Sequence, residues 1–216
     1  MTWRRFGGDR GQAFPIYAVV VAGLLFAALA YFTIGKAAIV RSNAQGAADA
    51  AALAAAREAR DTLLPGIDLA ALSPQEWEQV LLGNRFDPSG DACAAARDFA
   101  AMNDATVTCD RSGTRFTVRS MTNGTVGDSV VPGTSGKRGE ADARAEIVPR
   151  CHVKPGGSGG GADPEPTPTL TPAPTPEPPG PIKFSCGKGV VVDYNPTQPR
   201  AWRSLAAALF DIRLID

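Results

Sequence analysis

A long apolar run near the N-terminus is the first strong pattern in the chain. No charged side chain occurs over residues 11–35, and the segment 14–34 is apolar almost throughout. As a helix rising about 1.5 Å per residue, that segment reaches about 32 Å, enough for a bilayer core of about 30 Å. Tyr17 and Tyr31 lie near its ends, where amphipathic rings favour the headgroup level. The pattern predicts a transmembrane helix over 14–35.

Charges around this run predict its orientation. Three arginines precede it within the first 13 residues, whereas one lysine and one arginine follow closely: Arg4, Arg5, Arg10, Lys36 and Arg41. The bias predicts a cytoplasmic N-terminus (1–13) and an exported C-terminal domain, in a single-pass protein of the cell membrane. A cleavable signal peptide is the alternative, because Ala28–Ala30 offers a small-x-small site. The apolar run continues past that site, so we expect the span to be retained.

An alanine-rich segment, 36–61, follows the apolar run. Alanine has the highest helix propensity, so the helix is expected to continue beyond the membrane as a stalk. Ile39, Gly46 and Leu53 recur every seven residues, with Ala50 and Ala54 beside them, and together they form a flat stripe of mostly small side chains. Such a stripe suits close approach by a sheet or by another helix.

Residues 62–154 are expected to form an α+β extracytoplasmic domain. Ser73, Pro74 and Glu76 form a capping box that predicts a helix start, and Asp91 predicts the cap of a further helix over 92–102. The alternating runs 105–109 and 114–119 predict a hairpin, 126–139 a loop, and 141–148 a strand with alanines on one face. The expected fold class is therefore α+β, a long N-terminal helix with a small antiparallel sheet and helices in a pilin-like ectodomain.

The segment 155–181 differs sharply from the rest, because it holds more than half of the 18 prolines, together with glycine and threonine. This composition predicts an extended linker without helix or sheet. The C-terminal segment 182–216 is expected to contain a strand over 190–194, a helix over 201–210 and a final strand over 211–216. It is too short for a core of its own, so we expect it to dock on the rest of the molecule.

Four cysteines follow the span: Cys93, Cys109, Cys151 and Cys186. In an exported domain they are expected to be oxidised, with three possible pairings. A helix followed by an antiparallel strand brings Cys93 near Cys109, which leaves Cys151 to pair with Cys186 across the linker. The linker would then loop out and could not act as a spacer.

Composition limits the chemistry that this chain can perform. The 216 residues carry 22 basic and 22 acidic side chains, a balance that does not favour nucleic-acid binding. The single histidine, His152, lacks a plausible catalytic partner, and the glycine run 156–161 lacks the lysine of a phosphate-binding loop. We predict no catalytic residue, no metal, no cofactor and no small-molecule substrate, and hence no enzymatic activity.

Asp49 is the one candidate interaction residue, a charge within the alanine run. It either faces solvent or contacts a partner helix or a basic residue of another protein.

The N-terminal half resembles the TadE/TadG-like proteins of the tight-adherence (Flp-type) pilus assembly system. The resemblance rests on the Arg-Gly-Gln-Ala motif at 10–13, the apolar span directly after it, and the alanine-rich Asp49 motif at 44–56. The segments 103–109 and 125–130, the linker, and the ending 209–216 are similar to the TadG-related proteins of actinobacteria.

The resemblance implies a non-enzymatic bitopic membrane protein that supports pilus assembly or surface adhesion, with pilins or other Tad membrane proteins as partners. The alternative is an envelope receptor or adhesin with a membrane-anchored binding head. One position departs from the Flp-type prepilin pattern, which carries Glu-Tyr at the fifth and sixth positions after the cleaved glycine. After Gly11 these positions hold Ile16 and Tyr17, so we expect no cleavage there.

Overall fold

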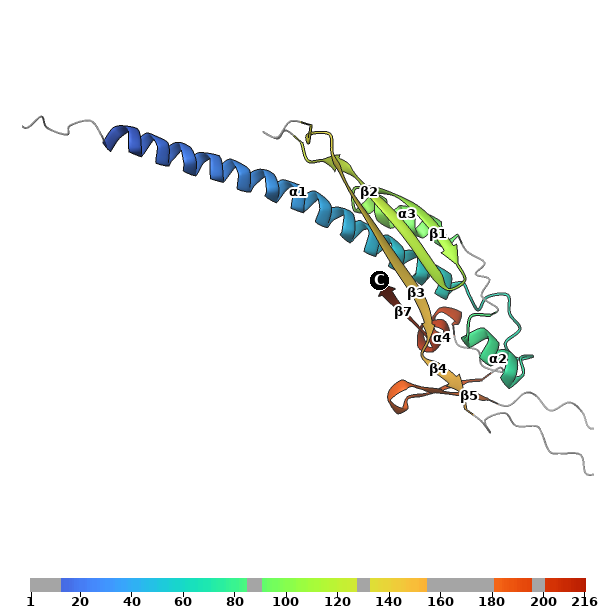
Figure 1. Ribbon diagram of the computed structural model, residues 1–216. Coiled ribbons are helices and arrows are strands. Elements are labelled where there is room, and N and C mark those ends of the chain that lie inside the picture. The colour runs from blue at the N-terminus through green and yellow to red at the C-terminus, as the bar shows by residue number, and fades with distance from the viewer. Residues whose placement is uncertain (1–12, 85–90, 128–132, 155–180, 196–200) are drawn as a thin grey trace, which may run out of the picture.

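The computed structural model of this chain consists of a long N-terminal helix and an α+β head that packs on its second half (Figure 1). The structure describes residues 13–84, 91–127, 133–154, 181–195 and 201–216. The predicted α+β class is confirmed. The helices are α1 (Ala13–Asp61), α2 (Pro74–Leu81), α3 (Ala92–Met102) and α4 (Trp202–Leu209), with a 3-10 turn at Gly187–Gly189. The strands are β1 (Ala105–Ser112), β2 (Arg115–Thr125), β3 (Arg138–Pro149), β4 (Cys151–Val153), β5 (Ile182–Cys186), β6 (Val191–Tyr194) and β7 (Phe210–Ile215).

Helix α1 is continuous over 49 residues, so the expected span and stalk form one helix of about 74 Å. Its first half projects away from the head, whereas its second half lies against the sheet and α3 (Figure 1). The alanines that face the head are buried, and Ala44, Ala48, Ala52 and Ala55 are fully inaccessible to solvent. The small side chains therefore let the sheet approach the helix closely.

The main sheet is antiparallel with strand order β1-β2-β3-β7. On β3, Ala143, Ala145 and Ile147 are buried against the helical layer, as the alternating sequence predicts, while the residues between them face outward. Strands β1 and β2 are longer than expected: β1 continues to Ser112 and β2 to Thr125. The expected loop 126–139 ends in β3, which begins at Arg138; residues 128–132 of that loop lie outside the described part.

The C-terminal segment returns to the head, as expected for a piece without its own core. Strand β7 pairs with β3, with Ile212 opposite Ile147, and so forms one edge of the main sheet. Helix α4 contacts α1 and buries Leu205 and Leu209. The last residues of the chain thus complete the layer that supports α1.

A second sheet, β4-β5-β6, lies at the end of the head far from the start of α1 (Figure 1). Its strands β4 and β5 are not predicted by the sequence analysis. Helix α2 packs on this sheet through Trp77, whose ring centroid lies 5.0 Å from that of Phe184 and 5.8 Å from that of Tyr194. The capping box of α2 forms as predicted, since Ser73 Oγ accepts from the Glu76 amide and the Glu76 carboxylate accepts from the Ser73 amide.

Candidate assembly surface

The first half of α1 is an apolar surface with no cover in the structure. Its large side chains are mostly exposed; Phe14, Phe26 and Tyr31, for example, are 77%, 74% and 82% exposed. This helix is long and apolar enough to cross a membrane, with a mean hydropathy of 2.2 in its most apolar window. Because none of that window is buried in the protein, the segment needs a partner other than the head.

The second half of α1 is held by the head at two close backbone approaches. Ser120 Oγ, which is fully buried, donates to the Ala44 carbonyl oxygen at 2.7 Å. Gly139 of β3 lies so near Val40 that a β-carbon at this position would overlap the Val40 carbonyl. These approaches fix how α1 rotates relative to the sheet, and therefore which of its faces points away from the sheet.

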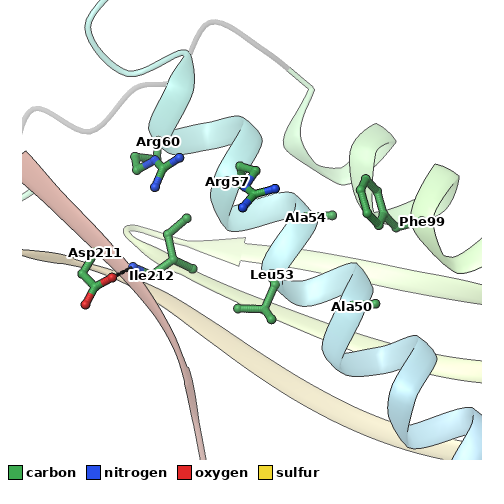
Figure 2. Close-up of a pocket in the computed structure, with 8 residues that line it drawn as sticks. All are labelled: Ala50, Leu53, Ala54, Arg57, Arg60, Phe99, Asp211 and Ile212. Carbon is green, nitrogen blue, oxygen red and sulfur yellow. Dashed lines mark hydrogen bonds between the residues drawn. The ribbon is translucent and has the colours of Figure 1, made fainter. Parts of the chain in front are cut away.

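The face of α1 between α3 and β7 borders an open groove of about 380 Å³ (Figure 2). Small or apolar side chains form its floor: Ala50, Leu53 and Ala54 from α1, with Phe99 of α3 on one side and Ile212 of β7 on the other. Phe99 is 42% exposed. Leu53, which the sequence analysis places in the seven-residue repeat, thus lies on a surface that the head leaves accessible. No sequence pattern predicts that Phe99 and Ile212 line the same groove.

Charged side chains border one end of this groove. Arg57 is exposed and has no hydrogen bond or ion pair among the described residues. Arg60 is largely covered and pairs with Asp61 at 2.8 Å. The Asp211 carboxylate accepts from the Ile212 amide at 3.0 Å. One free guanidinium therefore stands beside an apolar floor, which suits contact with another protein better than catalysis.

Asp49 lies in a neighbouring groove between α1 and the β3–β7 edge of the sheet. It is half-buried, and its carboxylate accepts from Gln45 Nε2 at 2.8 Å. The Gln45 amide also lies 3.5 Å from the Asp142 carbonyl oxygen. The other residues that line this groove include Ala143, Arg144, Leu214, Ile215 and Asp216. Asp49 therefore does not point freely into solvent. Its contact with a partner protein stays a prediction.

Two disulfides stiffen the head at the pairs that the sequence analysis expects. Cys93–Cys109 links α3 to β1, with a Cα–Cα distance of 5.6 Å. Cys151–Cys186 links β4 to β5 across a sequence separation of 35 residues. Beside this second bridge, the Lys154 amide donates to the Lys183 carbonyl at 2.9 Å. The two ends of the proline-rich segment therefore lie next to one another, and the segment adds no length between two parts of the head.

Chemical groups suited to catalysis do not gather in the described part of the chain. His152 is exposed on β4 opposite Ser185, and the described residues hold no group of His, Cys, Asp and Glu side chains placed to bind a metal. Burial, with a smaller contribution from the Asp68 carboxylate, raises the pKa of Tyr194 above its ordinary value. This tyrosine packs on Trp77 inside the head, so its shift reflects packing.

Comparison with known protein families finds a similarity in the N-terminal helix. Residues 11–58 match the family described as putative Flp pilus-assembly TadE/G-like, and α1 falls almost wholly within the match. Neither a curated protein nor a solved structure matches the chain. The N-terminal segment is therefore similar to TadE/G-like proteins over these residues. The similarity of the head to the TadG-related proteins of actinobacteria stays a prediction.

Proposed function

We propose that this TadE/G-like chain is a non-enzymatic, single-pass membrane protein that supports assembly of a Flp-type pilus. In this proposal the first half of α1 spans the membrane, the N-terminus is cytoplasmic, and the α+β head is exported. The observation that carries the proposal is the coincidence of the family match with one continuous helix, apolar and exposed in its first half and docked on the head in its second.

The partners proposed are pilins or other Tad membrane proteins, contacted through the groove at Ala50, Leu53, Ala54, Phe99 and Ile212. A membrane anchor keeps such partners parallel to α1 and beside it, which raises their effective concentration. An apolar floor flanked by the exposed Arg57 fits the composition of protein interfaces, where arginine and aromatic residues are enriched.

Complementation of a deletion strain tests this function. We expect loss of surface filaments on deletion, and failure of Leu53→Glu to restore them, because a carboxylate on the groove floor repels an apolar partner. Leu82→Glu places the same change at the C-cap of α2, where the leucine is 60% exposed and outside the groove, and is expected to restore them. Normal filaments and adhesion in the deletion strain would rule out the proposal. Normal filaments with lost adhesion would instead favour the envelope receptor or adhesin.

Topology and processing need a separate measurement. A periplasmic-type reporter fused after Asp216 should be active and a cytoplasmic reporter inactive if the head is exported. N-terminal sequencing should find no mature chain beginning at Gln12, because Ile16 stands where Flp-type prepilins carry the acidic residue. Such a chain would show that prepilin cleavage occurs and that the segment before Gln12 is removed.

A further inference from the structure

The paired ends of β2 and β3 extend in the direction of the first half of α1 (Figure 1). Three contacts show which part of α1 lies beside each part of β3. Gly139 lies against Val40, the Asp142 carbonyl lies near Gln45, and Arg144 shares a groove with Asp49. These contacts advance together along both segments, so β3 runs in the same direction as α1. The residues that precede Gly139 therefore lie closer to the membrane end of the helix.

The hairpin base is ordered where it approaches this level. The Val126 amide donates to the Lys137 carbonyl at 2.9 Å, and the Gly127 amide to the Ser135 carbonyl at 3.2 Å. The Gly139 amide donates to the buried Thr122 hydroxyl oxygen at 2.9 Å. The position of Lys137 and Arg138 thus follows from strand pairing and from the docking of Gly139 on α1.

Helix and strand geometry gives the distance of Lys137 and Arg138 from the predicted edge of the membrane. Val40 lies about 7 Å beyond the predicted end of the span at residue 35. Lys137 lies two residues before Gly139, or about 7 Å of extended chain, which brings it to the level of that end. The headgroup region adds about 5–7 Å on each side of the hydrocarbon core. Lys137 and Arg138, both exposed, therefore stand at headgroup level if the span is that of the proposed function.

Charge at this level is predominantly basic. Lys36, held with its ammonium 5.1 Å from the Phe32 ring centroid, and the exposed Arg41 come from α1, and Lys137 and Arg138 from the hairpin. The acidic groups at the same end of the head are Glu140 and Asp104, and the Asp104 carboxylate accepts from Asn123 Nδ2. Among the described residues at this level, four cations outnumber two carboxylates, while Asp128 of the same β2–β3 connection lies outside the described part. The base of the hairpin and the start of the stalk thus form one basic rim, defined here as Lys36, Arg41, Lys137 and Arg138.

We propose that this basic rim binds the anionic phospholipid headgroups of the leaflet on the head's side, so that the described base of the β2–β3 hairpin, at Lys137 and Arg138, is a second membrane contact beside the span. The contact holds the head at a fixed tilt, because α1 and the hairpin touch the bilayer at two separate points. A fixed tilt of the head also fixes the orientation of the groove at Leu53 relative to the membrane plane. This inference rests on the proposed membrane span.

Fluorescence of the full-length protein in lipid nanodiscs tests the contact. An environment-sensitive fluorophore is attached at Ser135→Cys, an exposed hairpin position, since all four native cysteines are in disulfides. We expect a blue-shifted emission in discs of phosphatidylcholine with phosphatidylglycerol, and less shift in phosphatidylcholine alone. Lys137→Glu with Arg138→Glu should lower the membrane-associated population of the hairpin about tenfold or more, and high salt should lower it in the parent protein.

A matched control separates the contact from a general effect of charge. Lys154→Glu with Lys183→Glu makes the same change at two exposed positions, one directly after β4 and one on β5, at the far end of the head, and should leave the emission unchanged. An emission that is identical in the two lipids, or unaffected by the hairpin variant, would overturn the lipid contact while the chain stays in the disc. A chain that does not enter discs at all would instead overturn the span, and with it the proposed function.

Discussion

The two halves of α1 differ in how their apolar surface is covered, although they form one unbroken helix. In the first half, bulky residues such as Leu24, Leu25 and Phe26 are 61–74% exposed. In the second half, alanines such as Ala48 and Ala52 are fully buried under the sheet. Bulky side chains suit a fluid, adaptable solvent such as lipid, whereas small ones suit a fixed surface brought close to the backbone. Side-chain size, more than hydrophobicity, therefore distinguishes the half proposed to span the membrane from the half that docks on the head.

Placing charge in the first half should have the largest effect. Leu24→Arg with Leu25→Arg puts two guanidinium groups in the middle of the span, at a cost of about 2.5–3.5 kcal/mol each for membrane insertion. We expect a large loss of chain resistant to alkaline extraction from membranes. Ser42→Arg with Asn43→Arg adds the same charge to exposed stalk positions and should leave anchoring intact. Equal anchoring of both variants would show that the first half does not cross the bilayer.

Enlarging a buried alanine in the second half should have the next largest effect. Ala52→Leu forces extra volume between α1 and the sheet, which should lower the free energy of unfolding by about 1–3 kcal/mol. Denaturant unfolding of the purified protein, followed by tryptophan fluorescence, measures this change.

The same substitution in the exposed half, Ala27→Leu, provides the control and should leave the stability of the head unchanged. If the two variants unfolded alike, the contrast between the halves would be wrong.

A smaller effect is expected at the hydrogen bond that holds the second half to β2. Ser120→Ala removes the bond from the buried hydroxyl to the Ala44 carbonyl, and should lower stability by about 1 kcal/mol. Ser112→Ala changes an exposed serine of the same sheet and should have no measurable effect. An equally small change in both variants would mean that close packing of the alanines alone positions α1.

Local signals made much of this fold predictable. The alanine content of 36–61, the Ser73–Glu76 capping box and the Asp91 cap each act within a few residues, and all three helices form where they are expected. The alternation at Ala143, Ala145 and Ile147 likewise marks the buried face of β3, because strand periodicity depends only on neighbours in sequence.

Contacts between distant segments were not predictable in the same way. Strand β5 contains Phe184 as a core residue but is only five residues long and directly follows the proline-rich segment, so no local pattern distinguishes it from the linker. The groove depends on Phe99 and Ile212: α3 brings Phe99 to one side of it, and the return of β7 to β3 brings Ile212 to the other. Such sites arise from chain topology, and a single sequence carries no direct record of it.

Asp49 offers the finest test of the docking half, because it separates folding from partner binding. Asp49→Ala removes one exposed hydrogen bond, with Gln45, so stability should fall by no more than about 1 kcal/mol. If Asp49 contacts a basic partner, co-purification of Tad membrane proteins or pilins from cross-linked membranes should drop several-fold. Asp98→Ala, at an exposed position on α3, should retain the partner. Equal recovery with both variants would assign Asp49 to the local pairing with Gln45, and would leave the Leu53 groove as the contact surface on this helix.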